Sequence, residues 1–546
     1  MPGRLLLYAR TIRHLRPVQV TNRIWRRLYR PAIPGRTEPA LRPVVSAFIP
    51  GIGRPATVLG PNRVRFLSEE GSIESSAAWN DPSRAKLWLY QLHYFDDLCA
   101  ADAPLRRELH RELIERWIRE NPPGCGVGWD PYPLSLRIVN WIKWHLSGNA
   151  LDDAALASLA QQVRYLRPRL EYHLLGNHLL ENLKTLVVAG CFFAGAEADS
   201  WRVDGLRMLQ KQVSEQVLPD GGHFELAPMY HGIVLEGLLD VVNVLRTYGF
   251  AVPEWLSAAC RRMVRWSAAM VHPDGEWAQF NDTALGFAAR PDALQAYAER
   301  LGIEVPLQCE TLTVLRDSGF VRAARGPWVL FADVGDLGPD YNPAHGHADT
   351  LSFELSCRQE RLIVDTGVST YETGPLRSFQ RSTRAHNTVE VDSEDSSEVW
   401  ASFRVARRAR AHDLQAVESP EATVIVGEHD GYRRLRGNPI HRREWRLTDD
   451  TLIVTDTVLS RGKHRLTARI HLHPRYRVRQ SSPELMEIVD GSGACVATLS
   501  RGSWPTAQIE SYHYSPTFGQ TVPGAVVALS ATCDTAATLH FMLAAV

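Results

Sequence analysis

The sequence has no uninterrupted apolar run that could cross a membrane. A spanning helix needs about 20 apolar residues, whereas the longest candidate, residues 183–194, is shorter and contains Lys184. The chain is therefore not expected to be an integral membrane protein. It also has no CxxC pair, and its eight cysteines are scattered through apolar patterns. This distribution is typical of buried free thiols and excludes a disulfide framework or a zinc ribbon.

Net charge is absent, and acidic residues are missing from one end of the chain. The formal net charge is zero, so the field of the whole molecule would not attract nucleic acid, and no such partner is expected. No acidic residue precedes Glu38, whereas arginines stand at positions 4, 10, 13, 16, 23, 26, 27, 30 and 36. This arm is typical of a basic helical segment packed on the main domain. Peripheral attachment to an anionic membrane surface is the alternative.

No secretory signal is recognised at the start of the chain. The apolar core of such a signal is longer than the run from Leu5 to Leu7. The expected location is the cytoplasm or the inner membrane surface, with the periplasm as an open alternative.

The length of the chain predicts two large domains. Its 546 residues exceed what one ordinary core holds. After an arm and connector over residues 1–60, apolar stripes with helical spacing and short loops fill residues 61–310, which indicates an incomplete (α/α) toroid. From residue 311 to 546 the spacing changes to that of many successive strands, which predicts an antiparallel β-sandwich.

A segment rich in histidine and aspartate lies within the predicted strands, from Tyr341 to Val389. His345, His347 and Asp349 alternate along the chain, and in an extended segment they would share one face and enter one cleft. Residues 351–357 and 361–365 are expected to form a hairpin, so that Asp365 ends the second strand near His386 and Asn387. These side chains suit proton transfer and metal binding.

Two helical segments add further polar candidates. Along residues 171–190, leucines occupy one helical face, and Asn177, His178 and Glu181 lie on the other, which favours a cleft wall. Residues 219–232 supply Glu225 and Tyr230 after a Gly-Gly turn.

A third helical segment, residues 128–144, places Arg137, Asn140 and Trp141 near one another. An aromatic platform with arginine and asparagine suits a sugar acid, because the guanidinium pairs with the carboxylate. A tryptophan-rich packing helix is an equal alternative.

Taken in order, these motifs resemble the heparinase II/III-like polysaccharide lyases. The resemblance covers most of the chain, from about Trp88 to the late strands, and it is carried by Asn177-His178 with Glu181, by Glu225 with Tyr230, and by the segments HGHAD (345–349), VDTG (364–367) and HNTV (386–389). It implies a toroid followed by an antiparallel β-sandwich. It also implies β-elimination on a uronic-acid polysaccharide such as a glycosaminoglycan, alginate or a bacterial exopolysaccharide.

The resemblance also implies roles for single residues. Asn177 would neutralise the substrate carboxylate with help from His345, while Tyr230 and His178 would form the acid and base pair, in an order left open. His347, Asp365 and His386 would hold a structural divalent metal, zinc or alternatively manganese. Glu181, Glu225 and Arg384 would support or bind the substrate.

Two other functions remain as alternatives. A uronyl C5-epimerase needs the same carboxylate neutralisation and a two-sided acid and base pair. A glycan-binding or assembly protein could keep the scaffold without catalysis. A hydrolase is disfavoured because no carboxylate pair with clear acid and base roles is apparent.

Overall fold

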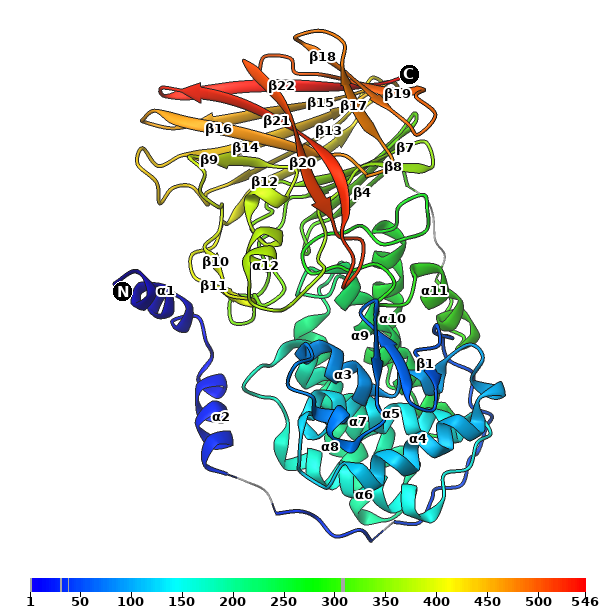
Figure 1. The fold of residues 1–546 in the computed structure, drawn as a ribbon. Coiled ribbons are helices and arrows are strands. Elements are labelled where there is room, and N and C mark those ends of the chain that lie inside the picture. The colour runs from blue at the N-terminus through cyan, green and yellow to red at the C-terminus, as the bar shows by residue number, and fades with distance from the viewer. Residues whose placement is uncertain (1, 30–31, 38, 306–309) are drawn as a thin grey trace.

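The computed structural model describes residues 2–29, 32–37, 39–305 and 310–546. The two largest hydrophobic cores in this part of the chain lie mainly among the helices and among the strands. Figure 1 shows the helical domain below the layered strands. The last long helix ends at Arg300 and the first strand of the second core begins at Leu312, so the change of architecture falls between these residues.

The helical domain is the predicted toroid, built from helices that pack against their sequence neighbours. α7 contacts α5, α8 and α9, and α10 contacts both α9 and α11. Leucines, valines and tryptophans fill the space between these helices. The helices are α3 (Lys86–Tyr94), α4 (Arg107–Glu120), α5 (Pro131–Leu146), α6 (Asp153–Leu166), α7 (Gly176–Phe192), α8 (Ala196–Gln216), α9 (Pro228–Thr247), α10 (Glu254–Ala269) and α11 (Pro291–Arg300).

The strands form stacked antiparallel sheets, which confirms the predicted class. One sheet has the order β4-β5-β6-β7-β8, a second β20-β21-β16-β9, and a third β12-β13-β14-β15-β22-β19-β18-β17. The strands are β4 (Leu312–Leu315), β5 (Phe320–Arg325), β6 (Trp328–Asp333), β7 (Phe353–Cys357), β8 (Glu360–Ile363), β9 (Val389–Val391), β12 (Ala411–Glu418), β13 (Thr423–His429), β14 (Ile440–Leu447), β15 (Thr451–Leu459), β16 (His464–His471), β17 (Arg477–Gln480), β18 (Leu485–Val489), β19 (Cys495–Ser500), β20 (Thr506–Tyr514), β21 (Val522–Cys533) and β22 (Ala536–Ala545).

The predicted hairpin in the histidine-rich segment is present. β7 and β8 pair antiparallel, with Cys357 opposite Glu360. The segment before it is a loop and not a strand: residues 341–352 contain turns and no ladder pairing. The expectation that His345, His347 and Asp349 share one face of a strand is therefore wrong, because turns interrupt the extended backbone there.

Smaller elements surround the two domains. A short sheet, β1 (Val58–Gly60), β2 (Arg63–Phe66) and β3 (Glu69–Ser72), precedes the toroid, and the short helix α12 (Pro375–Gln380) follows β8. The arginine-rich arm forms α1 (Pro2–Ile12) and α2 (Pro17–Leu28) at the edge of the molecule.

None of the helices in the described residues combines the length and apolar character needed to cross a bilayer. The described cysteines are free thiols, as predicted, but burial holds only for Cys191, Cys260, Cys357 and Cys533, since Cys99 and Cys495 are half-buried and Cys125 is exposed. Cys309 lies outside the described residues.

Candidate functional site

The site lies where the loop after α10 meets the loop between β6 and β7. Asp282, from the toroid, accepts hydrogen bonds from two histidines of the second domain: His345 Nδ1 lies 3.0 Å from its Oδ2, and His347 Nε2 lies 2.8 Å from its Oδ1. Arg377 of α12 pairs with both oxygens of the same carboxylate. Since Arg377 and Asp282 are fully buried, the pair fixes both histidines in place.

Tyr230, at the start of α9, packs directly on His345. The two ring centroids are 3.8 Å apart, and the Tyr230 hydroxyl is 3.1 Å from the hydroxyl of Tyr371. Burial, followed by the neighbouring Tyr371, raises the pKa of Tyr230 well above 10. The phenol is therefore protonated at neutral pH and able to donate a proton.

Asn177 is held by Glu225. The side-chain Nδ2 of Asn177 lies 2.9 and 3.1 Å from the two carboxylate oxygens, and its backbone N–H donates to Oε1 at 3.0 Å. Glu225 Oε2 is also 3.6 Å from His345 Nε2, so one carboxylate links the amide to the histidine. The predicted direct contact of Glu225 with substrate is replaced by this positioning role, because its oxygens are buried and already bonded.

The backbone at the start of α7 allows the close contact between Asn177 and Glu225. Leu175 and Gly176 both adopt positive φ, 64° and 55°. A Cβ on Gly176 would come within 2.3 Å of Glu225 Oε1 and of Asn342 Nδ2. A larger residue would strain the backbone and displace Glu225 and Asn342, so glycine is favoured here, and the backbone N–H of Asn177 reaches Glu225.

His178 stands next to Asn177 and is the most accessible of the four predicted catalytic residues. Its side chain is 29% exposed, and its Nδ1 lies 3.2 Å from Glu171 Oε2. Burial alone would lower the pKa of His178, but the charge and hydrogen bond of Glu171 outweigh it, so the pKa is raised above 6.5. With Nδ1–H donated to Glu171, Nε2 is the free proton acceptor.

A group of potential metal ligands lies beside these residues. His347, Asp349 and His386 bring one ligand atom each within 4.8 Å of one another. His347 Nδ1, Asp349 Oδ2 and His386 Nε2 are buried atoms without a hydrogen-bond partner. Two imidazoles and a carboxylate with free lone pairs fit a divalent metal.

The predicted third ligand is corrected by this geometry. Asp365 lies 2.5 Å from Nδ1 of His386, so its carboxylate orients the imidazole and leaves Nε2 pointing to the group. Asp349, in place of Asp365, is the carboxylate that lies with His347 and His386 in the group of potential ligands. Burial raises the pKa of Asp349 to about 6 and lowers that of His347 to about 3, so His347 is neutral, as a ligand must be.

The predicted sugar-binding set on α5 is also corrected. Arg137 and Trp141 are fully buried in the toroid core, and Asn140 is 7% exposed. Arg137 donates to Gln162 Oε1 at 2.9 Å and stacks on Trp117. Because Arg137 and Trp141 lie inside the domain, a polymer cannot contact them, and the packing alternative holds.

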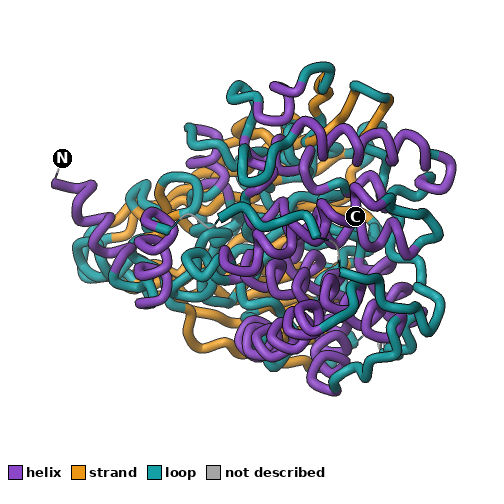
Figure 2. Tube along the Cα trace, turned by 90° about the horizontal axis from the view of Figure 1, so that it is seen from below, coloured by secondary structure: helices purple, strands orange, loops and turns teal. Residues whose placement is uncertain are grey.

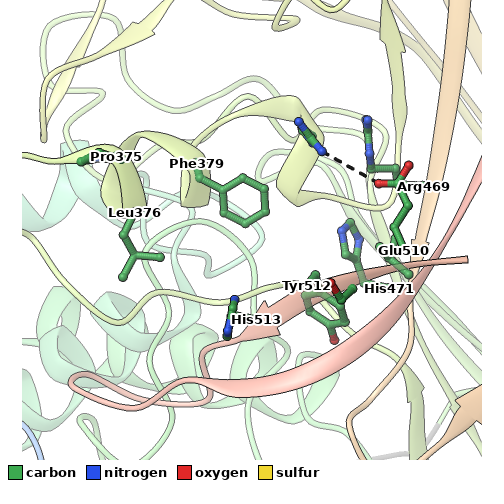
Figure 3. A pocket seen from close by; sticks show the side chains of 11 residues that line it. Pro375, Leu376, Phe379, Arg469, His471, Glu510, Tyr512 and His513 are labelled. Atoms are coloured by element: carbon green, nitrogen blue, oxygen red, sulfur yellow. Dashed lines mark ion pairs between the residues drawn. The ribbon is translucent and has the colours of Figure 1, made fainter.

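Two further predicted substrate contacts lie elsewhere. Glu181 is fully buried and pairs with Lys184, because the face of α7 on which it lies turns into the toroid. Arg384 lines a pocket of about 360 Å³ in the second domain and lies 3.9 Å from Glu510. Figure 3 shows this pocket, with Phe379 of α12 and Tyr512 of β20 at its wall.

Sequence reasoning missed several residues that position the site, namely Asp282, Tyr371, Arg377, Glu171 and Asn281. Asn281 has φ 55°, and its side-chain oxygen accepts a hydrogen bond from the backbone N–H of His347 at 2.8 Å. Among these residues, only the Asn-Asp pair at 281–282 had a local sequence pattern that could have indicated a site, because it follows an apolar stretch. The other residues carry no local pattern.

In total, the arrangement joins one protonated phenol, one imidazole with a free nitrogen, one fixed amide and one fixed histidine. These are groups of the kinds that can bind a carboxylate and transfer protons.

Comparison with known proteins agrees with this architecture. The heparinase II/III N-terminus model matches residues 75–300, and the heparinase II/III-like C-terminal model matches residues 309–537. A heparin-sulfate lyase of Bacteroides stercoris is 25% identical over 328 residues, 55% of this chain and 46% of that protein. FtsZ-localized protein C of Caulobacter vibrioides is 27% identical over 428 residues, 72% of this chain and 71% of that protein. The chain thus spans about half the length of the heparin-sulfate lyase it matches.

Solved structures share the fold. A crystal structure of heparinase III superposes with a TM-score of 0.68 at 16% identity, covering 88% of this chain and 78% of that one. A heparan sulfate lyase mutant from Pedobacter heparinus gives 0.61 at 17% identity, covering 87% and 79%. With the two family models accounting for the toroid and most of the strand domain, the chain belongs to the heparinase II/III-like family.

Proposed function

We propose that the chain is a polysaccharide lyase that cleaves a uronic-acid polymer by β-elimination. The observation that carries the proposal is the meeting of Asn177, Tyr230 and His345, from three separate segments, through Glu225 and direct ring contact. The lyase names of several relatives support it.

The first requirement is to make the proton at C5 of the uronate removable. Its acidity rises when the charge of the adjacent carboxylate is neutralised by fixed donors. In this proposal Asn177 and His345 hold that carboxylate. Both are already held in position, Asn177 by Glu225 and His345 by Asp282.

The second requirement is a base on one side and an acid on the other. We assign the base to His178 Nε2, since Glu171 occupies Nδ1, and the acid to Tyr230, whose phenol is protonated. His178 takes the C5 proton, the electron pair forms the C4–C5 double bond, and the bond from C4 to the glycosidic oxygen breaks. Tyr230 gives its proton to that oxygen.

A divalent metal would have a supporting role. His347, Asp349 and His386 would hold it, with Asp365 orienting His386; zinc suits this donor set, and manganese is the alternative. When bound, it would supply a positive charge that fixes the loop between β6 and β7, on which His345 also lies.

The test is ultraviolet absorbance during incubation with heparan sulfate, heparin, chondroitin, dermatan, hyaluronan, alginate and bacterial exopolysaccharide. Each new C4–C5 double bond beside the carboxylate absorbs. A rise with the wild type that vanishes in Tyr230→Phe supports the proposal and names the substrate. If no polymer gives a rise but deuterium from solvent enters C5, the chain is an epimerase and the proposal fails.

A second candidate is a glycan-binding protein without turnover. It is favoured by FtsZ-localized protein C, whose name states a location and no reaction and which aligns over 72% of this chain. Binding of one polymer by the wild type, with neither a double bond nor deuterium exchange, would select it.

A further inference from the structure

The amphipathic helix α2 carries its apolar stripe on the outside. Val20, Ile24 and Leu28 recur at fourth positions along one helical face and are 40%, 55% and 78% exposed. Trp25, beside them, is 52% exposed. A surface helix of a globular protein normally buries this face, so the stripe on α2 is not used by the fold of the chain itself.

The opposite, polar face of α2 makes the contacts with the body. Gln19 is 2% exposed, and its Nε2 donates to Tyr341 O at 3.1 Å. Arg26 donates to Arg169 O at 3.0 Å, and the Arg16 guanidinium stacks 3.7 Å from the Tyr341 ring centroid. Hydrogen bonds and stacking thus hold α2 in the orientation that turns its apolar stripe to solvent.

α1 repeats the pattern on the second domain. Arg10 pairs with Glu398 at 3.2 Å, and the hydroxyl of Thr11 lies 3.3 Å from Val405 O. Leu5 and Ile12, two turns apart on one side of α1, are 73% and 53% exposed. Figure 1 shows both helices along one edge of the molecule, and Figure 2 shows α1 projecting beyond the rest of the chain.

The charge of the arm indicates what covers the stripe. Arg13, Arg23 and Arg27 are exposed, and no acidic residue precedes Glu38. The exposed apolar stripe and its tryptophan suit the acyl chains at the surface of a bilayer. The flanking arginines, which no acid within the arm neutralises, suit anionic headgroups. We propose that α1 and α2 form a docking surface for an anionic lipid membrane.

The test is co-sedimentation of the full chain with vesicles, one set of phosphatidylcholine alone and one with phosphatidylglycerol added. The wild type is expected to sediment with the anionic vesicles and to be released by salt. Ile24→Asp with Leu28→Asp should weaken binding more than tenfold, because two exposed apolar side chains no longer enter the lipid. Arg23→Gln with Arg27→Gln should weaken it about fivefold for each arginine.

The matched control is Leu105→Asp. Leu105 is 89% exposed but lies far along the chain, before α4, so its loss should leave vesicle binding unchanged. Because all these positions face solvent, the melting temperature of each variant should equal that of the wild type.

Three results would overturn the proposal. The first is absence of wild-type binding to anionic vesicles, and the second is equal loss in the Leu105→Asp control. The third is sedimentation velocity showing a dimer that Ile24→Asp with Leu28→Asp dissociates, since the stripe would then be a contact between two copies.

Discussion

Helices α5 and α7 pack against each other in the toroid, yet their polar residues have opposite fates. On α5, Asn140 donates to Tyr94 O at 2.9 Å and to Asp96 Oδ1 at 2.8 Å, within its own domain. On α7, Asn177 stands in the first turn and is held by Glu225, which also reaches His345 of the second domain. Both residues are asparagines, and their positions along the helices differ: Asn140 lies in the middle of α5 and contributes to packing, whereas Asn177 lies at the start of α7 and contributes to the candidate site.

The physical reason is the geometry of helix ends. A residue in the middle of a buried helix is surrounded by neighbouring helices, so its hydrogen bonds must be satisfied there. A residue in the first turn lies beside the incoming loop and can meet another segment. At α7, the positive φ of Leu175 and Gly176 turns the chain so that the backbone N–H of Asn177 meets Glu225. The N-cap of α5, Asp130, has an ordinary extended backbone, and Pro131 follows it.

The largest effect is expected from Tyr230→Phe. Loss of the proposed acid should lower kcat about a thousandfold on the polymer that the wild type cleaves, with the melting temperature unchanged. The matched control is Tyr371→Phe, which removes the hydroxyl that contacts Tyr230 and should cost roughly tenfold or less. Equal losses in both variants, measured by absorbance, would contradict the assignment of the acid.

Asn177→Ala and Asn140→Ala test the comparison of the two helices directly. Asn177→Ala should reduce kcat/KM about a hundredfold, because a fixed donor to the substrate carboxylate is lost. Asn140→Ala should keep kcat/KM and instead lower the free energy of unfolding by about 1–3 kcal/mol, since Tyr94 O and Asp96 lose a buried donor. Steady-state kinetics and urea unfolding measure the two effects; a kinetic defect in Asn140→Ala would break the distinction.

Metal binding should stabilise the wild type and support activity. Zinc is expected to raise the melting temperature, as any ligand of the folded state does, and a chelator should lower activity about tenfold. His386→Ala should abolish the thermal shift. Asp365→Asn should only weaken it, because Asp365 orients His386 and Nε2 remains available. A full zinc shift in His386→Ala would place the metal elsewhere.

The smallest effect concerns pH. A base must be neutral to act, so activity should fall as pH drops through the pKa of His178, which Glu171 raises above 6.5. Glu171→Gln removes the negative charge that favours the imidazolium, so the acid limb of the kcat/KM profile should move to lower pH. An unchanged or higher midpoint would show that another group is the base.

Periodicity alone predicted most of the architecture. The helical spacing predicted for residues 61–310 corresponds to α3 to α11, and the hairpin predicted for residues 351–365 is β7 and β8. Apolar spacing reports a local property, the face that a segment buries, and so it can be read without the fold. The histidines and Tyr230 were also visible as a set of chemistry-bearing residues.

Which of those residues meet was decided by tertiary structure. His345 and His347 both lie on Asp282, 63 and 65 residues away in sequence, and Asp349 replaces Asp365 among the possible ligands because Asp365 bonds Nδ1 of His386. The sequence shows that α2 is amphipathic; only its contacts through Gln19 and Arg26 reveal that the apolar side faces out. Composition and spacing determine what a segment can bury, whereas long-range contacts determine which polar atoms are already satisfied and which remain free to act.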